Sequence, residues 1–355
     1  MHPYRRKIDW YLLGSAVVLS CWSVFHLYTL STDGSYYYFY RQLIWVGSGL
    51  FFLSLFYLLP TTTWSRLTYL AYLFITIFLI GVLIKGEGVY GARRWLEIGW
   101  IGFQPSEFAK IVLIGSLAKI MAGHKDVGWK VIFLSFLLTL FFSLLIAAQP
   151  DLGTALILIF LWLIILFISG VSLRKFLIIL GVIFAALPFS YFFLLRPYQK
   201  LRILTFLDPQ KDPLGAGWSS LQSKIALGSG GILGKGIGGA AHTQLKYLPQ
   251  PFTDFIFSSI GEQWGFIGAV LIISVYFIII MRGIDLALRK GRSFAGLFSG
   301  GFTALIALQA FVNMGMASGI IPVTGVPLPF LSYGGSSTLL FLSGIGILLA
   351  FNRET

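Results

Sequence analysis

Long apolar runs separated by short polar turns dominate the chain. A helix that crosses the hydrocarbon core of a bilayer needs about 20 apolar residues, and ten runs reach or approach that length. They are Ile8–Leu30, Gln42–Leu59, Leu67–Ile84, Phe108–Met121, Val131–Ala148, Thr154–Ser169, Phe176–Leu195, Phe255–Met281, Ala295–Met316 and Thr338–Phe351. Lipid offers no hydrogen bonds to the backbone, and no strand alternation is sustained along the sequence. The runs therefore predict an all-α, polytopic membrane protein of about ten helices.

The composition supports one integral-membrane domain over residues 1–355. Hydrophobic residues make up 57% and charged residues 11%, whereas soluble domains carry about 25% charged residues. A net charge of +13 in such a chain is expected to set orientation and to contact anionic membrane lipids. The sequence contains no Arg/Lys-rich tract typical of nucleic-acid binding. Cys21 is the single cysteine, which excludes an internal disulfide and a cysteine metal cluster.

The first run, Ile8–Leu30, has two interpretations. The apolar region of a cleaved signal peptide is shorter and ends at a small-residue cleavage site. This run is long and ends in HLYTLSTDG, so we expect it to be retained as the first span.

The basic residues of the short loops predict the orientation. In an even-span topology they fall on one side, which is then the cytoplasmic side and holds both termini. They are Arg5, Arg6, Lys7, Arg66, Lys119, Lys125, Lys130, Arg174, Lys175, Arg282, Arg289, Lys290, Arg292 and Arg353. Nine of the 13 acidic residues lie at or beside the opposite loops: Asp33, Glu87, Glu97, Glu107, Asp151, Asp208, Asp212, Asp254 and Glu262. The outer face is therefore expected to carry the chemistry, away from ATP.

A large polar segment, Arg196 to Glu262, lies between the seventh and eighth runs, with its extracellular loop at about 196–254. Loops of this length are usually functional or disordered. Apolar residues recur throughout this one, so we expect it to be ordered. Its glycine cluster, 228–239, brings backbone N–H groups close to Lys224 and Lys235, an arrangement that suits a pyrophosphate. A flexible lid is the alternative.

Asp254 is the last polar residue before hydrophobic sequence resumes, and it is flanked by Phe252, Phe255 and Phe257. Partial burial raises the pKa of a carboxyl group and neighbouring cations lower it. Asp254 is thus a candidate general base near neutral pH. The competing interpretation is a helix cap, because Thr253-Asp254 precedes a span.

Other polar groups are expected at the same face. Glu107 and Lys110 lie three residues apart at the start of a helix that Pro105 begins, either as a simple ion pair or as functional groups at membrane depth. Arg93 and Arg94 are suited to a phosphate or to lipid headgroups. Asp151 precedes a span and is a natural N-cap.

Residues 319–337 hold three prolines and several glycines, so they cannot form a regular helix. Irregular backbone is tolerated at membrane depth where protein surrounds it. We expect a re-entrant loop, with a simple connector as the alternative.

Taken together, these motifs closely resemble the SEDS family, named for shape, elongation, division and sporulation. The resemblance covers nearly the whole chain and rests on GARRW, FQPSEFAK, QPDLGTAL, the DPLGAGW segment with IALGSGG, TDFIFSSIGE and VPLPFLSYGGSS. The ending NMGMASGIIPVTGVPLPF looks more like the rod-elongation branch than the division branch.

The resemblance implies a peptidoglycan glycosyltransferase that polymerises lipid II, with Asp254 as the catalytic base. Asp254 would deprotonate the 4-hydroxyl of the acceptor sugar, and undecaprenyl pyrophosphate would leave with inversion. Glu107, Lys110, Trp95, Arg93 and Asp151 would support the site. Lipid II and its pyrophosphate would be bound by Arg202, Gln222, Ser223, Lys224, Lys235 and Ser332.

The resemblance also implies partners and a location. A class B penicillin-binding protein, a PBP2-type transpeptidase, and other elongation-complex proteins are expected in the bacterial cytoplasmic membrane. No cofactor is fixed by the sequence, although a divalent cation (Mg²⁺ or Mn²⁺) is a candidate for the leaving group. Relatives often carry an acid and a histidine in the positions of Gln250 to Phe252, where this chain has neither, so more weight falls on Asp254.

Two rival functions remain at this point. A lipid II flippase would need a polar path across the bilayer, but the ionisable residues gather at one side. A scaffold that only recruits a transpeptidase would not need Asp254, Glu107 and Lys110 at one boundary.

Overall fold

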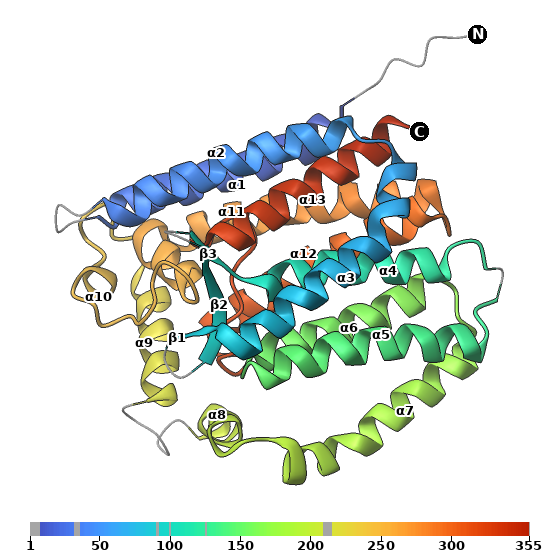
Figure 1. Ribbon diagram of the computed structural model, residues 1–355. Coiled ribbons are helices and arrows are strands. Elements are labelled where there is room, and N and C mark those ends of the chain that lie inside the picture. The colour runs from blue at the N-terminus through green and yellow to red at the C-terminus, as the bar shows by residue number, and fades with distance from the viewer. Residues whose placement is uncertain are drawn as a thin grey trace.

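The computed structural model describes residues 8–31, 36–89, 92–98, 101–124, 126–208 and 215–354. These residues form an almost entirely helical bundle (Figure 1). The expected basic residues Arg5, Arg6, Lys7 and Lys125 and the acids Asp33 and Asp212 lie outside the described residues. The helices of the bundle are α1 (Trp10–Thr29), α2 (Tyr37–Leu58), α3 (Thr61–Lys85), α4 (Pro105–Met121), α5 (Trp129–Ala148), α6 (Leu152–Ile168), α7 (Leu173–Phe189), α11 (Ile256–Lys290), α12 (Phe294–Ser318) and α13 (Gly335–Arg353).

The prediction of an all-α, polytopic membrane protein is confirmed. Nine of these helices are long and apolar enough to cross a membrane, judged over the described part of the chain. The tenth, α4, has 17 residues and lies at the short end of the spanning range. The even number brings the start of α1 and the end of α13 to one end of the bundle, here called the terminal end (Figure 1).

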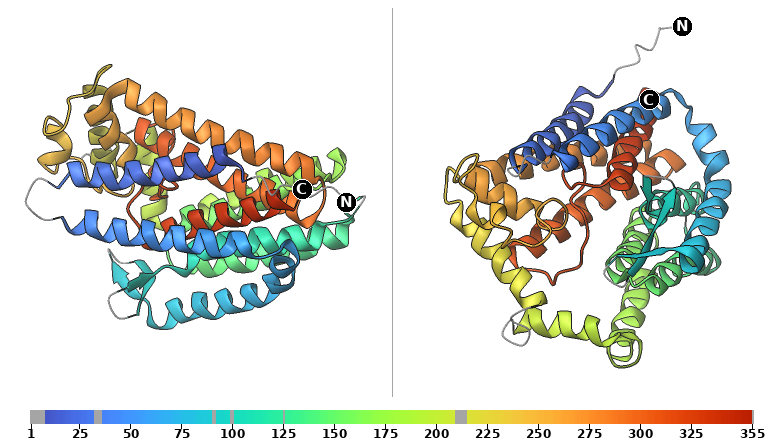
Figure 2. Two further views of the ribbon diagram at one scale, coloured as in Figure 1. Left: turned by 90° about the horizontal axis from the view of Figure 1, so that it is seen from above. Right: turned by 60° about the vertical axis from the view of Figure 1, so that its left-hand side comes forward.

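The opposite end, here called the loop end, carries the large polar segment. This segment is ordered as expected over its described residues and contains α8 (Pro197–Leu207), α9 (Ala216–Ser229) and α10 (Ala241–Gln244). Figure 2 shows α9 and α10 beside the start of α11, whereas α7 lies apart from the rest of the bundle and α8 leads from it to α9. Ile179 is the buried residue of α7, so this helix presents most of its apolar surface outward.

A small antiparallel sheet at the loop end was not predicted. Its strands are β1 (Glu87–Val89), β2 (Ala92–Ile98) and β3 (Ile101–Phe103), in the order β1-β2-β3. The strands are short and lie between two spans, so they give no sustained alternation in the sequence. The consequence is that the GARRW motif lies on a strand, whose successive side chains point to opposite faces.

Helices α12 and α13 lie at the centre of the bundle. Small residues allow their close packing against neighbours, as is usual between membrane helices. A side chain at Gly346 would meet the backbone of Leu53 on α2, and one at Gly301 would meet Ile114 and Ile165 on α4 and α6. The spans that hold the site are thereby fixed relative to one another.

Charged groups join three helices at the terminal end. Asp9 caps α1 by accepting a hydrogen bond from Leu12 N at 3.1 Å, and its other carboxylate oxygen lies 2.7 Å from the guanidinium of Arg282 on α11. Arg289, about two helical turns further, pairs with Asp285 and donates to the Asn352 side chain on α13. The Asp9 side chain is 4% exposed, whereas that of Asp285 is 46% exposed.

This difference in exposure generates a stability prediction. Asp9→Ala removes both a helix cap, worth about 1 kcal/mol, and a charged hydrogen bond to Arg282, and should lower the apparent Tm in detergent by several degrees. Asp285→Asn removes only exposed ion pairs, which contribute about 0–1 kcal/mol, and should change Tm little. Equal shifts in thermal unfolding for the two variants would contradict the assigned role of Asp9.

Candidate active site at the loop end

Asp254 lies in a tight turn immediately before α11. The backbone N–H groups of Thr253 and Phe255 both donate to the carbonyl of Gln250 at 3.2 Å, which closes the turn. The N-cap residue of α11 is Phe255, and no side chain caps this helix among the described residues. The capping interpretation of Asp254 is therefore wrong, because its carboxylate does not accept a hydrogen bond from the first turn of α11.

The backbone of this turn is held from outside by the segment before α13. Tyr333 N donates to Phe252 O at 2.8 Å, and Ser332 Oγ donates to Thr253 O at 2.7 Å. Ser332 Oγ also accepts a hydrogen bond from Leu328 N at 2.8 Å, so its hydroxyl is engaged on both sides.

Asn313 on α12 completes this support. Its Nδ2 donates to Asp254 O at 2.9 Å and to Val326 O at 2.8 Å, and the residue is fully buried. Three consecutive carbonyls, those of Phe252, Thr253 and Asp254, thus each accept a hydrogen bond from residues 313–333. The carboxylate is positioned through its backbone.

Opposing effects act on the Asp254 carboxyl. Burial has the largest effect and raises its pKa above the ordinary value, and the negative charge of Asp151 adds to the rise. A hydrogen bond with Thr253 and the positive charges of Arg94 and Arg202 lower the pKa without cancelling the effect of burial. A carboxyl with a raised pKa is suited to accept a proton near neutral pH.

Arg94 on β2 connects Asp254 to the start of α6. Its guanidinium donates to the carbonyl of Pro150 and lies 3.9 Å from Asp151 Oδ1. Asp151 caps α6 as predicted, accepting from Thr154 N at 3.3 Å. Arg94 Nε is buried with no hydrogen-bond partner among the described residues, so a donor of this guanidinium is free for an anion.

The proline-rich segment after α12 forms the other wall. Residues 319–334 are irregular, as predicted, and their second part, 326–332, is largely buried. Gly325 has φ +73° and packs so closely to Asp254 that a side chain there would meet its carboxylate oxygen at 3.4 Å. Arg202 NH1 on α8 donates to Val323 O at 3.4 Å, which brings a second cation to this wall.

Glu107 and Lys110 form a buried ion pair in the first turns of α4. Lys110 Nζ lies 2.7 Å from Glu107 Oε1, and their side chains are 0% and 2% exposed. Removing one partner of such a pair costs about 3–5 kcal/mol because it leaves a buried charge. Glu107 Oε2 and Ser106 Oγ have no hydrogen-bond partner among the described residues. The pair is thus more than a surface i,i+3 contact.

The other predicted site residues take diverse positions. Trp95 on β2 packs over Gly102, whereas the Arg93 side chain lies outside the described residues. Gln222 is buried, and Ser223 Oγ bonds to Ser258 Oγ at 2.6 Å and to Ala317 O at 2.8 Å. A buried hydroxyl bonded in this way positions α9 against α11 and α12.

The two predicted lysines lie on the polar segment. Lys224 on α9 lies across Gly319, and Lys235 Nζ lies 3.7 Å from Glu262 Oε1. The sequence did not single out Glu262, yet its buried carboxylate accepts from His242 N, Thr243 N and Thr243 Oγ1 at 2.7–3.0 Å. The sequence signals for it were its place among the acids of the outer face and at the end of TDFIFSSIGE.

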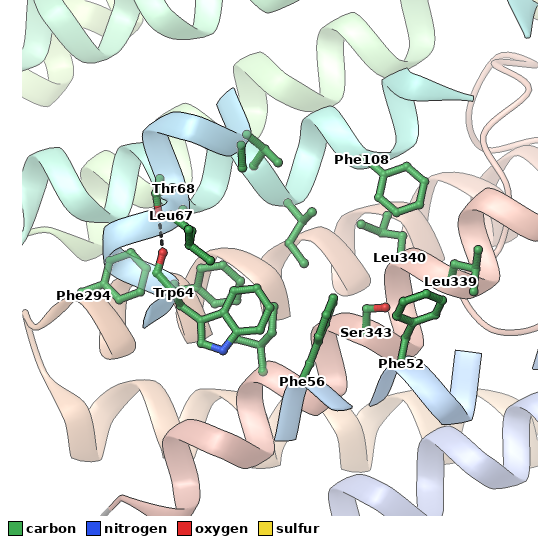
Figure 3. Close-up of a pocket in the computed structure, with 16 residues that line it drawn as sticks. Phe52, Phe56, Trp64, Leu67, Thr68, Phe108, Phe294, Leu339, Leu340 and Ser343 are labelled. Carbon is green, nitrogen blue, oxygen red and sulfur yellow. Dashed lines mark hydrogen bonds between the residues drawn. The ribbon is translucent and has the colours of Figure 1, made fainter. Parts of the chain in front are cut away.

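An apolar pocket of about 340 Å³ lies between α2, α3, α4, α12 and α13 (Figure 3). Aromatic rings form much of its wall, and the hydroxyl of Thr68 is already bonded to Trp64 O at 2.8 Å. Phe108, which lines the pocket, directly follows Glu107. The pocket extends from Phe108, near the start of α4, to Trp64 and Phe294 in the first turns of α3 and α12, and its lining suits a hydrocarbon chain.

Within the described residues, groups of three or more His, Cys, Asp or Glu side chains that would hold a metal do not occur. Arg94 and Arg202 supply positive charge beside Asp254. A requirement for Mg²⁺ or Mn²⁺ remains a prediction from the sequence.

The fold and this site define a polytopic integral membrane protein with a desolvated carboxylate between two arginines at one end of its bundle. Residues 6–355 match the profile of the FtsW/RodA/SpoVE family, described as cell cycle protein. The chain belongs to this family.

Relatives and solved structures agree with that assignment. The peptidoglycan glycosyltransferase MrdB of Escherichia coli K12 is 38% identical over 317 residues, covering 88% of this chain and 85% of MrdB. Stage V sporulation protein E of Bacillus subtilis is 37% identical over 328 residues, covering 90% and 88%.

Among structures, a chain from a peptidoglycan synthase complex that coordinates polymerization and crosslinking matches with a TM-score of 0.84 and 33% identity over 98% of both chains. The rod shape determining protein RodA of Thermus thermophilus matches with a TM-score of 0.74 and 30% identity over 99% of both chains.

The support of the Asp254 turn generates a prediction. Asn313→Ala leaves the carbonyls of Asp254 and Val326 buried without donors, at a cost of about 1–3 kcal/mol each. We expect faster amide hydrogen exchange over residues 250–256 and a lower Tm. Ser318→Ala on the same helix removes only a hydroxyl bonded within the helix and serves as control. Unchanged exchange in Asn313→Ala would show that the turn is held by other contacts.

Proposed function

We propose that this protein is a peptidoglycan glycosyltransferase that polymerises lipid II for cell elongation in the bacterial cytoplasmic membrane. The observation that carries the proposal is Asp254, a carboxylate with a raised pKa between two arginines, in a chain whose relatives include named peptidoglycan glycosyltransferases. The loop end then faces away from the cytoplasm, in agreement with the loop charges.

In the proposed reaction, Asp254 takes the proton of the acceptor sugar 4-hydroxyl. The oxygen attacks the anomeric carbon of the donor as the bond from that carbon to the pyrophosphate oxygen breaks. The products are a β-1,4 link with inverted configuration and undecaprenyl pyrophosphate. Preorganised positive charge stabilises such a leaving group. Arg94 and Arg202 are the groups whose charge reaches Asp254, with Lys224 and Lys235 on the neighbouring polar segment.

The apolar pocket supports a lipid-linked substrate. Its wall carries aromatic rings from α2, α3, α4 and α12, among them Phe56, Trp64 and Phe108 (Figure 3). A polyprenyl chain in this pocket stays in a hydrocarbon environment while its head group lies at the loop end. In this proposal the buried ion pair fixes the first turns of α4, which lie between the pocket and the head-group site.

The proposed partner is a class B penicillin-binding protein of the PBP2 type, within a set of elongation proteins. The similar chain in a synthase complex that couples polymerization and crosslinking supports a transpeptidase partner.

The proposal predicts that Asp254→Asn, which keeps the shape of the side chain but cannot accept the proton, abolishes polymer formation. Purified protein with its partner and labelled lipid II measures this, and thermal unfolding verifies the fold. Asp208→Asn, a carboxylate of the same segment at the end of α8, is the control and should retain activity. Full-length polymer from Asp254→Asn would exclude Asp254 as the base.

The same assay in vesicles separates the rival flippase. Wild-type protein that moves labelled lipid II between leaflets but yields no polymer, even with its partner, would favour transport.

The pH dependence of activity gives a second prediction, in which two variants shift the acid side of the pH profile in opposite directions. Activity requires ionised Asp254, so it falls as the pH drops through the raised pKa. Arg202→Gln removes a cation, raises that pKa further, and should move the acid limb of the rate profile to higher pH. Asp151→Asn removes an anion, lowers the pKa, and should move the limb to lower pH; asparagine still caps α6. Parallel shifts in both variants would contradict the electrostatic assignment.

A further inference from the structure

The glycine loop 230–239 packs directly on the backbone of α11. A side chain at Gly230 would meet Gly261 O, and one at Gly234 would meet Gln263 O. Lys235 N and Gly236 N donate to the carbonyls of Glu262 and Gln263 at 3.0 Å. Glycine at these positions permits contacts that any other residue would block, so the loop has one fixed location on α11.

Helix α11 is interrupted where this loop meets it. Gly265 has φ +66° and ψ −162°, outside the helical region. The next two N–H groups, of Phe266 and Ile267, donate to Gly231 O and Ile232 O at 2.9 and 3.2 Å. The loop therefore caps the second part of α11, which begins at Phe266.

The two parts of α11 have different surroundings. Residues 256–263 are all buried inside the protein. From Phe266, which is 65% exposed, large apolar side chains face outward along the helix. Lipid thus meets α11 from Phe266 onward, at the level where the loop carbonyls cap it.

The apolar length of this second part is short for a bilayer. It runs for the 16 residues from Phe266 to Met281, before Arg282 and Asp285. At a rise of about 1.5 Å per residue this is roughly 24 Å, whereas the hydrocarbon core is about 30 Å thick. A bilayer whose hydrocarbon core ends at Arg282 therefore extends past Phe266, and further apolar surface is needed there at the loop end.

Ile232 and Leu233 lie beside the start of the second part of α11, where the further apolar surface is needed. Their side chains are 70% and 78% exposed, and the Ile232 carbonyl is bonded to the first turn of the lipid-facing helix. Ile237, 62% exposed, extends the same loop.

We propose that Ile232 and Leu233 insert into the membrane leaflet at the loop end, and that the loop 230–239 is a membrane anchor of the polar segment. Through Glu262, which holds residues 242 and 243, the anchor fixes the height of the segment above the lipid. The lipid is recognised only by its hydrocarbon and not by a particular headgroup.

The test places a fluorescent label in the loop of the full-length protein without partner. Leu233→Cys and, separately, Ile232→Cys are made with Cys21→Ser, labelled with a polarity-sensitive dye, and reconstituted in phosphatidylcholine nanodiscs. His124→Cys, exposed in the turn after α4, is the matched control. Nanodiscs with spin-labelled acyl chains quench dyes in the leaflet, and iodide quenches dyes in water.

The proposal expects a blue-shifted emission at both loop positions. Spin-labelled lipid should quench about half of the fluorescence intensity, as for groups about 5–10 Å below the headgroups. Iodide should have little effect there and should quench the control strongly. Emission at both loop positions that matches the control, with full iodide access, would overturn the proposal and assign these side chains to a protein partner.

Discussion

Backbone groups at membrane depth must find partners inside the protein, and this constraint shapes the loop end. Residues 319–334 are not helical, yet their peptide groups are paired with a few side chains and neighbouring turns. Asn313 bonds Val326 O and Ser332 bonds Leu328 N within this segment, and both side chains also hold the turn of Asp254. The same interactions that make an irregular segment tolerable in the bundle also position the proposed base.

Charge at the loop end depends on this arrangement. Burial disfavours the ionised carboxylate of Asp254, while Arg94 and Arg202 arrive from β2 and α8 to favour it. Each arginine is itself held by a backbone carbonyl, of Pro150 and Val323 respectively. The strand β2 and the helix α8, which are not spans themselves, thus complete the site of Asp254, which lies just before the span α11.

Periodicity and composition were sufficient for the helices, because hydrophobic length is a local property of the sequence. The helical, multi-span architecture, the ordered polar segment and the cap of α6 by Asp151 were all predicted. The small sheet was not, since its strands are short. For the same reason the sequence could not place Arg94 beside Pro150 and Asp151, because only pairing with β1 and β3 establishes a strand there. Asn313 resembled any polar residue in an apolar helix until its carbonyl partners 59 and 13 residues away were known. The roles of the predicted site residues in binding and catalysis stay predictions.

The three carbonyl contacts of the Asp254 turn have one more consequence. Only a few hydrogen bonds hold the turn in place, whereas the surrounding helices are held together by extensive apolar interfaces. Heating can therefore release the turn while the spans remain folded, since local openings require less free energy than global unfolding. A substitution that weakens one of these hydrogen bonds would give a temperature-sensitive protein. It would be active at low temperature and inactive at higher temperature while it stays inserted in the membrane.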